Sequence, residues 1–316
     1  MRNENRRNNE NLNLDRTLQG YHQGGYGAAN HEQYAFMGYT KNLYFVSDRA
    51  KELDENFNPV DGTTILKGYG LEIETNFAYS DHALAANILR YTVFPLFPKH
   101  LFKIQADCTI TGAEMITQVM SKEFIRNHYK DFKQMWDEIF PNFRIDTQNE
   151  NCGMHVNVSL ALLGTTPAAQ EENVRKLYYF INKHYELCKV LFNRVNDCTY
   201  CRKMNADAAW TMNIHNMDSS HGNCFNGSHF DAGRIEIRLV GGQKNFACFR
   251  NTMETIFHLV GNMKNLKRSE LDDVTKVFKG CNSYVYDRLT KARNEYQISN
   301  AELEKIAPTV KAVTFI

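Results

Sequence analysis

Three short segments in which apolar and polar residues alternate constrain the fold of this chain most strongly. They are residues 68–74, 152–159 and 233–240. Successive side chains of an extended strand point to opposite faces, so each segment would bury its apolar residues and gather its polar residues on the other face. These polar residues are Glu72 and Glu74, then His155, Asn157 and Ser159, then Arg234, Glu236 and Arg238. The pattern predicts strands with one core face and one face that carries chemistry.

Glu72 and Glu74 are the most informative pair, because like charges on one strand face repel each other. A cation between them relieves the repulsion, and oxygen-rich sites of this kind suit Mg²⁺ or Mn²⁺. A solvated polar face is the ordinary alternative for a Glu-x-Glu sequence taken alone. If the three strands share a sheet, however, one face combines carboxylates, an imidazole and guanidinium groups. Such a set is able to hold metal ions and a polyphosphate together.

Composition limits the classes of function that fit this chain. It has 316 residues, of which 43% are hydrophobic, enough for one large core or for one core with a small appendage. The formal net charge of +1 gives no general attraction to nucleic acid or to an anionic membrane. No segment approaches the roughly 20 apolar residues of a membrane span, and residues 1–7 lead into no secretory signal. We therefore expect a cytoplasmic protein without nucleic-acid or membrane partners.

Eight cysteines without an export signal are typical of reduced thiols rather than of a disulfide framework. One alternative is a structural zinc site, because a C-x-x-C pair is followed by an H-x-x-C pair with suitable ligand types. Its ligands would be Cys198, Cys201, His221 and Cys224. The separation of the two pairs matches no diagnostic spacing, so unpaired thiols are the preferred interpretation and zinc is not expected.

The chain divides by composition into three parts. Residues 1–60 are rich in Asn, Arg and Glu and then in Gly and Tyr, which predicts an extension that is partly disordered or docks a partner or a second copy. Residues 61–266 alternate strand patterns with amphipathic helices and form the predicted main domain. Helices are predicted over about 121–140, with Ser121 as the cap, and over about 168–193 and 246–262. Residues 267–316 read as a helical appendage. We expect an α+β fold, with a largely antiparallel sheet, helices on its apolar face and the site on its polar face.

The order of five short motifs resembles the amidoligase family. The motifs are Gly70-x-Glu72-x-Glu74, Asp107-x-Thr109 followed by Glu114, the segment 152–158, the segment from Arg194 to Arg202, and the segment 235–238. The resemblance covers about residues 67–262, and it rests on the combination because each motif alone is weak. Members of this family are similar in fold to glutamine synthetase and glutamate–cysteine ligase. The resemblance therefore implies a glutamine synthetase-like fold for the main domain.

The resemblance also implies an activity, namely the ATP- and magnesium-dependent joining of a carboxylate to an amine through an acyl phosphate. Small-molecule or peptide carboxylates and amines would be the substrates, and Mn²⁺ is an alternative ion. By position, the implied metal ligands are Glu72, Glu74, Glu114 and Glu236, and His155 would lie beside the metal or the nucleotide. Because these residues belong to a polar strand face, we expect alanine at Glu72 or Glu236 to leave the fold almost unchanged.

Three further residues receive implied roles. Arg238 would clamp phosphate through its planar guanidinium, and Arg202 is a weaker candidate for holding the substrate carboxylate or a phosphate. Asp107 would orient or deprotonate the amine, although a turn position makes backbone capping an equal alternative. The chain departs from the family at Asn157, where a second His is common. The family's Arg-Tyr stretch is also not recognisable in residues 208–213.

Two other classes of function fit the same residues. A metal-dependent amide hydrolase would use His155 and the carboxylates to activate water, although the chain contains no H-E-x-x-H motif. A binding or assembly protein would keep the fold without the activity and would use residues 1–60 as a docking arm. An assay for nucleotide binding separates the ligase from both alternatives.

Overall fold

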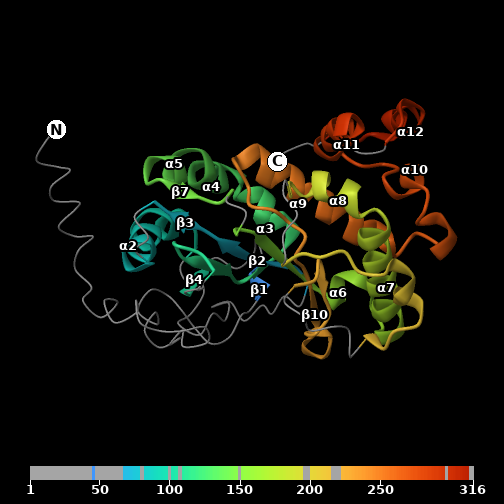
Figure 1. Cartoon of the computed structure of the whole chain (residues 1–316), viewed down its shortest axis with the longest axis horizontal. Helices are drawn as coiled ribbons and strands as arrows, with labels where there is room; N and C mark the ends of the chain where they lie inside the picture. Colours follow the sequence, from blue (N-terminus) through green and yellow to red (C-terminus); the bar gives the residue numbers. More distant parts are fainter. Residues whose placement is uncertain are drawn as a thin grey trace, which may run out of the picture. The chain divides into compact units, whose positions relative to one another are not determined.

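The computed structural model describes residues 45–46, 67–78, 82–98, 101–105, 109–148, 151–194, 200–214, 222–295 and 298–312 (Figure 1). The protein is mixed α+β, and all but one of the strand pairs with described register are antiparallel, which confirms the predicted fold class. Two compact units are distinguished, one containing Gly70–Cys152 and the other containing Leu66–Tyr69 with Gly153–Ile316. Most of the predicted N-terminal extension and the candidate Asp107 lie outside the described residues.

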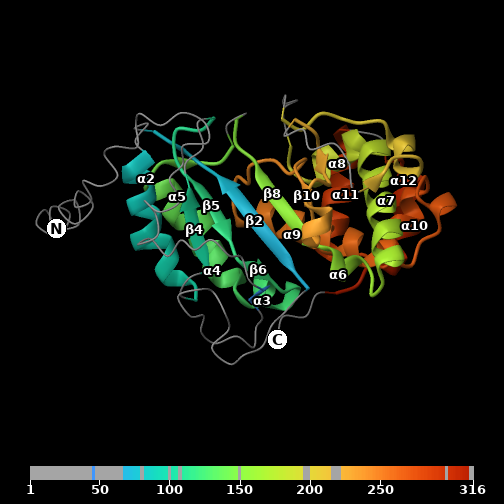
Figure 2. The same ribbon diagram turned by 90° about the horizontal axis from the view of Figure 1, so that it is seen from below.

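The first unit is built on β2 (Tyr69–Glu74), β5 (Glu114–Thr117) and β4 (Phe102–Gln105), in which β5 pairs antiparallel with both β2 and β4 (Figure 2). Leu71 and Ile73 of β2 are fully buried, as the alternation predicts. The remaining strands are β1 (Phe45–Val46), which pairs in parallel with β6 (Val119–Met120), and β3 (Asn76–Phe77), which pairs with β7 (Ile145–Asp146).

Helices of the first unit form where the sequence places them. Ser121 caps α3 (Lys122–Asn127), because its side chain accepts a hydrogen bond from the Phe124 amide at 2.9 Å. The predicted helix over 121–140 is divided into α3, α4 (Tyr129–Gln134), η5 (Met135–Ile139) and α5 (Phe140–Asn142), and its aromatic residues Phe124, Phe132 and Trp136 are buried core. The other helix runs through α2 (His82–Ile88), η3 (Leu89–Val93) and η4 (Phe94–Leu96).

The second unit contains the two other predicted strands and one that the sequence did not indicate. β8 (Met154–Ser159) pairs antiparallel with β10 (Arg234–Ile237), and β10 pairs antiparallel with the two-residue strand β9 (Phe225–Asn226). Val156 and Val158 of β8 and Ile235 and Ile237 of β10 are buried. The alternation of these two strands therefore predicts correctly which side chains enter the core.

The helices of the second unit pack around α9 (Phe246–Met263), which contacts helices that precede it and helices that follow it in the chain. The helix predicted over 168–193 is two helices, α7 (Pro167–Lys183) and α8 (Tyr185–Leu191), because the backbone leaves the helical region at His184. The remaining helices are α6 (Leu160–Leu163), η6 (Ala206–Trp210), η8 (Phe230–Ala232), η9 (Arg268–Glu270), α10 (Val274–Val277), α11 (Ser283–Glu295), α12 (Asn300–Ile306) and η10 (Ala307–Thr309). Within the described part of the chain, every helix is too short or too polar to cross a membrane.

His184, at the junction of α7 and α8, should make stability depend on pH. Its Nε2 lies 3.0 Å from the carbonyl oxygen of Leu271, and burial lowers the pKa of the imidazole below its usual value. Below pH about 6.5 the unfolded chain therefore binds more protons than the folded chain. The stability that neutral His184 contributes is complete above that pH and is lost as the pH falls. We expect urea unfolding to show a smaller loss of stability between pH 7.5 and 5.5 in His184→Gln than in the wild type. Equal losses in both proteins would contradict this assignment.

Candidate functional site

Three carboxylates share one face of the strand pair β2 and β5. Glu72 and Glu74 are two residues apart on β2, and Glu74 lies directly opposite Glu114 of β5. Glu74 and Glu114 are 8% and 5% exposed, whereas Glu72 is half-buried. The predicted carboxylate face is therefore formed, and it gains Glu114 through the strand register.

Backbone contacts at the start of β5 hold these carboxylates in register. The Thr75 hydroxyl donates to the Ala113 carbonyl oxygen at 2.6 Å and accepts from the Ala113 amide at 3.0 Å. A Cβ atom on Gly112 would come within 2.3 Å of the Thr75 carbonyl oxygen, so only glycine permits this approach. At the other end of the pair, the Leu71 amide donates to the Thr117 hydroxyl at 2.8 Å. The side chains of Glu74 and Glu114 are thus fixed on neighbouring strands.

The second unit contains a buried network of His155, Glu236, Arg238 and Asn226. Nη1 of Arg238 donates to Oε1 of Glu236 at 2.7 Å, and Nδ2 of Asn226 donates to Oε2 at 3.0 Å. Nδ1 of His155 lies 3.2 Å from the same Oε1 and 3.4 Å from Nη1 of Arg238. Both carboxylate oxygens of Glu236 are therefore engaged within this unit.

Nδ1 of His155 lies between a donor and an acceptor. The guanidinium of Arg238 can only donate, so its contact with Nδ1 requires the bare nitrogen, whereas the carboxylate of Glu236 can only accept and requires a proton there. Both side chains therefore hold the imidazole ring through Nδ1.

The expectation that Glu236 lies on an exposed face is wrong. Glu236 is only 4% exposed. Asn157 and Asn226 lie opposite it on the two neighbouring strands, and the guanidinium of Arg238 contacts its carboxylate. An alanine at this position would remove the partner of a buried guanidinium. The substitution should therefore lower stability as well as alter the site.

Asn157, which departs from the family pattern, has a defined partner. The guanidinium of Arg234 donates through Nη1 to Oδ1 of Asn157, and Arg234 itself lies opposite Ser159 in the register of β8 and β10. An amide oxygen accepts this hydrogen bond from a cation, a role that a protonated imidazole does not fill. In this chain the position therefore serves a contact between β8 and β10.

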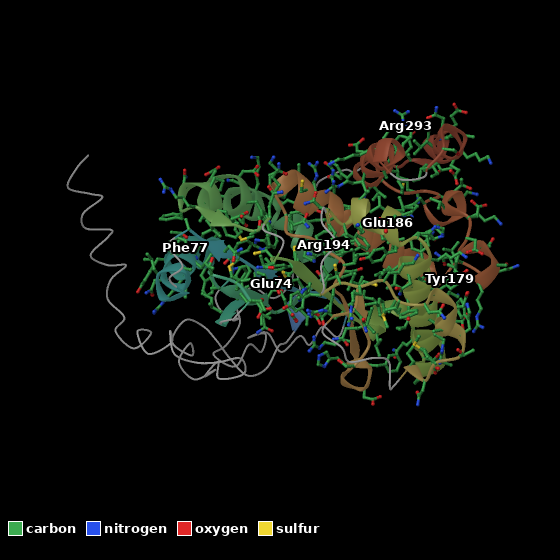
Figure 3. All side chains as sticks on the ribbon, in the orientation of Figure 1. Glu74, Phe77, Tyr179, Glu186, Arg194 and Arg293 are labelled. Carbon is green, nitrogen blue, oxygen red and sulfur yellow. The ribbon has the colours of Figure 1, made fainter. Side chains whose placement is uncertain are left out.

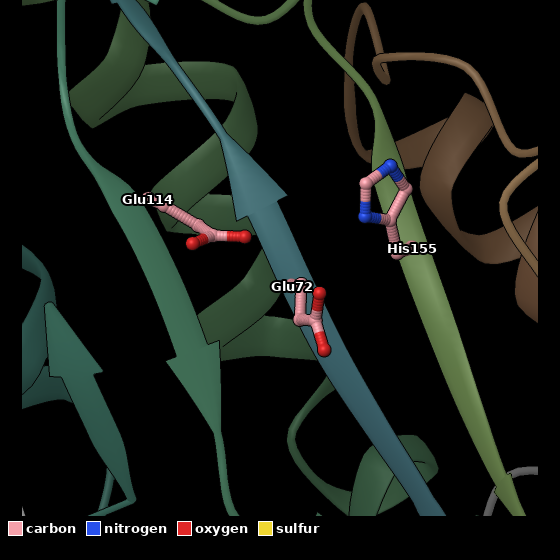
Figure 4. A group of neighbouring side chains, drawn as sticks. All are labelled: Glu72, Glu114 and His155. Carbon is pink, nitrogen blue, oxygen red and sulfur yellow. The ribbon is translucent and has the colours of Figure 1, made fainter. Parts of the chain in front are cut away.

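Figure 4 draws three side chains of the described part of the chain whose donor atoms are of the types found in metal sites. Glu72 and Glu114, on the carboxylate face of the first unit, each offer a carboxylate oxygen, and His155, in the second unit, offers a ring nitrogen. Glu114 and His155 are buried and Glu72 is half-buried. Glu74 and Glu236, the other two carboxylates predicted as metal ligands, are not members of this group.

The remaining candidate residues are Arg202 and the four possible zinc ligands. Arg202 is exposed, its Nε lies 3.5 Å from the Gly222 carbonyl oxygen, and its backbone forms a bridge with Asn223. Of the four candidate zinc ligands, Cys198 and His221 lie outside the described residues. Cys201 and Cys224 are buried, and burial raises the pKa of the Cys224 thiol to about 12. Its Sγ donates to Oδ1 of Asn182 at 3.2 Å.

Asn226 is the member of the buried network that sequence analysis missed. It lies on β9, a strand of two residues, which is too short to show an alternating pattern. The sequence signal at this position was that Asn226 precedes Gly227 and lies seven residues before Gly233. Gly233 has a left-handed φ of 83° and directly precedes β10.

No family model, curated protein or solved structure matches this chain.

Proposed function

We propose that this protein is an ATP- and magnesium-dependent carboxylate–amine ligase with a glutamine synthetase-like catalytic domain. In this reaction a carboxylate oxygen of one substrate bonds to the γ-phosphorus of ATP and ADP leaves. The amine of the second substrate then bonds to the acyl carbon, phosphate leaves, and an amide remains. The buried network of His155, Glu236 and Arg238 is the observation that carries the proposal.

Arg238 is suited to hold a transferring phosphoryl group. Its Nη1 is engaged by Glu236, and its Nε is buried and makes no hydrogen bond to any residue that the structure describes. A buried donor without an acceptor costs about 1–3 kcal/mol, so an anionic oxygen that reaches Nε would be stabilised there. Guanidinium groups hold phosphate oxygens at two points, and Glu236 keeps this one in a fixed orientation.

The donors on the described strands fit a divalent cation. Carboxylates such as those of Glu72, Glu74 and Glu114 suit Mg²⁺, and an imidazole such as that of His155 also suits Mn²⁺. The three carboxylates would hold such an ion on the strand face of the first unit. When bound, the ion would neutralise charge on the phosphate oxygens.

Binding of a nonhydrolysable ATP analogue, measured by calorimetry with and without Mg²⁺, tests the proposal directly. We expect binding that requires the ion, and Glu72→Gln should weaken it about tenfold or more, because the substitution removes one anionic ligand at nearly constant volume. Glu172→Gln is the matched control, since Glu172 pairs with Arg268 on an exposed surface of the second unit. Its affinity for the analogue should equal that of the wild type.

Turnover assays separate the alternatives. Release of ADP that requires both a carboxylate and an amine supports the ligase. Amide cleavage without ATP would instead identify a metal-dependent hydrolase. A protein that binds no nucleotide, and that loses a partner when residues 1–60 are deleted, would be a binding or assembly protein. Unchanged nucleotide affinity in Glu72→Gln would show that the carboxylate face is not the site.

A further inference from the structure

The turn that follows α8 is a Schellman motif, and it places Arg194. The Asn193 amide donates to the Val190 carbonyl oxygen at 3.2 Å, and the Arg194 amide donates to the Lys189 carbonyl oxygen at 2.8 Å. Asn193 takes the left-handed conformation that this motif requires, with φ of 59°. Asparagine adopts this conformation more readily than most residues. The helix end thus turns the chain at Asn193, and Arg194, which is labelled in Figure 3, is the next residue.

The guanidinium of Arg194 binds three consecutive backbone carbonyls beyond β10. Nη2 donates to the oxygens of Val240 at 2.8 Å and Arg238 at 3.3 Å, and Nε lies 3.4 Å from the oxygen of Leu239. Arg194 is only 8% exposed. Hydrogen bonds from a charged donor are stronger than those from a neutral donor, so a buried guanidinium that spans three carbonyls is a strong local restraint.

The same turn docks onto the segment 238–242 at two further points. The Gly241 amide donates to the Phe192 carbonyl oxygen at 3.0 Å, and Nδ2 of Asn193 donates to the Gly242 carbonyl oxygen at 2.8 Å. Gly241 approaches so closely that an added Cβ would lie 2.2 Å from the Asn193 carbonyl oxygen. The end of α8 and this segment are therefore in direct backbone contact.

This contact matters because Arg238 lies just beyond the last residue of β10. On one side, the amides of Arg238 and Leu239 both donate to the Cys224 carbonyl oxygen, at 2.9 and 3.0 Å. On the other side, Arg194 holds the carbonyl of Arg238 itself. The backbone that carries the Arg238 side chain is thus held from two directions, and Arg194 supplies the contact to the carbonyl of Arg238 itself.

We propose that Arg194 is a positioning residue, which fixes the backbone of residues 238–240 and thereby aims the guanidinium of Arg238 at a bound phosphate. The consequence for nucleotide binding rests on the proposed function, whereas the restraint of the backbone does not. Lysine at position 194 cannot reproduce it, because one ammonium group does not present the planar set of donors that spans three carbonyls.

Arg175 provides a matched control. Its Nη1 donates to the carbonyl oxygens of Ala209 at 2.6 Å and Met212 at 2.9 Å, so it also clamps backbone within the second unit. The clamped segment contains η6 and does not carry Arg238. Arg194→Lys and Arg175→Lys therefore make the same chemical change on two different segments.

Hydrogen exchange and calorimetry on the full chain test the proposal together. The amides of Arg238, Leu239 and Gly241 should exchange at least tenfold faster in Arg194→Lys than in the wild type, and Arg175→Lys should leave them unchanged. Affinity for the magnesium complex of a nonhydrolysable ATP analogue should fall about 10- to 100-fold in Arg194→Lys only, because small displacements of a positioned group have effects of this size.

The outcomes separate this inference from the proposed function. If the wild type binds no nucleotide, the ligase proposal fails, and the exchange rates at 238–241 still decide whether Arg194 holds the segment. Unchanged exchange in Arg194→Lys, or equal loss of nucleotide affinity in both lysine variants, would overturn the positioning role. If Arg194→Lys does not fold, Arg194→Gln serves in its place. Its neutral amide offers only two N–H donors from one nitrogen to the three carbonyls, and unchanged exchange there would equally overturn the inference.

Discussion

Gly241→Ala should lower the free energy of unfolding by about 1–3 kcal/mol or more, the range found when atoms are forced into a close-packed site. The added Cβ would lie 2.2 Å from the carbonyl oxygen of Asn193 and 2.8 Å from Cα of Arg194. Both are backbone atoms, so neither can move aside by a change of rotamer. The segment 238–242 would have to separate from the end of α8, and the Arg194 contacts would weaken with it.

Urea unfolding of Gly241→Ala measures this effect, and Gly261→Ala is its control. Gly261 lies inside α9 on the exposed side, and nothing lies within 4 Å of its would-be Cβ. Alanine is preferred to glycine in a helix interior by about 0.8–1.0 kcal/mol, so this variant should be as stable as the wild type or more stable. Equal stability of the two variants would show that the contact at Gly241 is not close.

Glu236→Ala should lower the free energy of unfolding by about 3–5 kcal/mol, because it leaves the guanidinium of Arg238 buried without its carboxylate. The two side chains are 5% and 10% exposed, and 2.7 Å separates Oε1 from Nη1. Asn226 would also lose the acceptor of its Nδ2 hydrogen bond. The effect should therefore be several times that of removing an exposed ion pair.

A double-mutant cycle isolates this interaction. Arg238→Met removes the charge but keeps an unbranched side chain, and the double variant should be less destabilised than the sum of the two single variants. Glu172→Ala serves as the exposed control and should cost less than about 1 kcal/mol, because its partner Arg268 has a side chain that is 56% exposed. Additive effects of Glu236→Ala and Arg238→Met would show that the pair is not coupled.

The sequence predicts the strands that bear the candidate site because each has a strict two-residue period. Leu71, Ile73, Val156 and Ile235 enter the core as that period requires. Local signals also place helix starts, as at Ser121, whose hydroxyl caps α3. The helix predicted over 246–262 is found at Phe246–Met263, because its apolar residues recur with the helical period throughout.

Contacts between residues distant in the chain account for what the sequence did not predict. His184 divides one predicted helix into two, and its ring meets Leu271, 87 positions further on. Asn226 joins the network around Glu236 from a strand too short to have a period. Asn157 of β8 accepts a hydrogen bond from the guanidinium of Arg234 on β10, a contact that the sequence did not predict.

The sequence by itself determined which side chains share a strand face, since the alternation of an extended backbone is a local property. Only the tertiary structure decided that Glu74, Glu114 and Glu236 are buried on their own strand faces, and that Arg194 holds the segment that carries Arg238. Burial and partner choice depend on strand register and on the way a helix end docks. Those are set by contacts between distant residues, which no local pattern records.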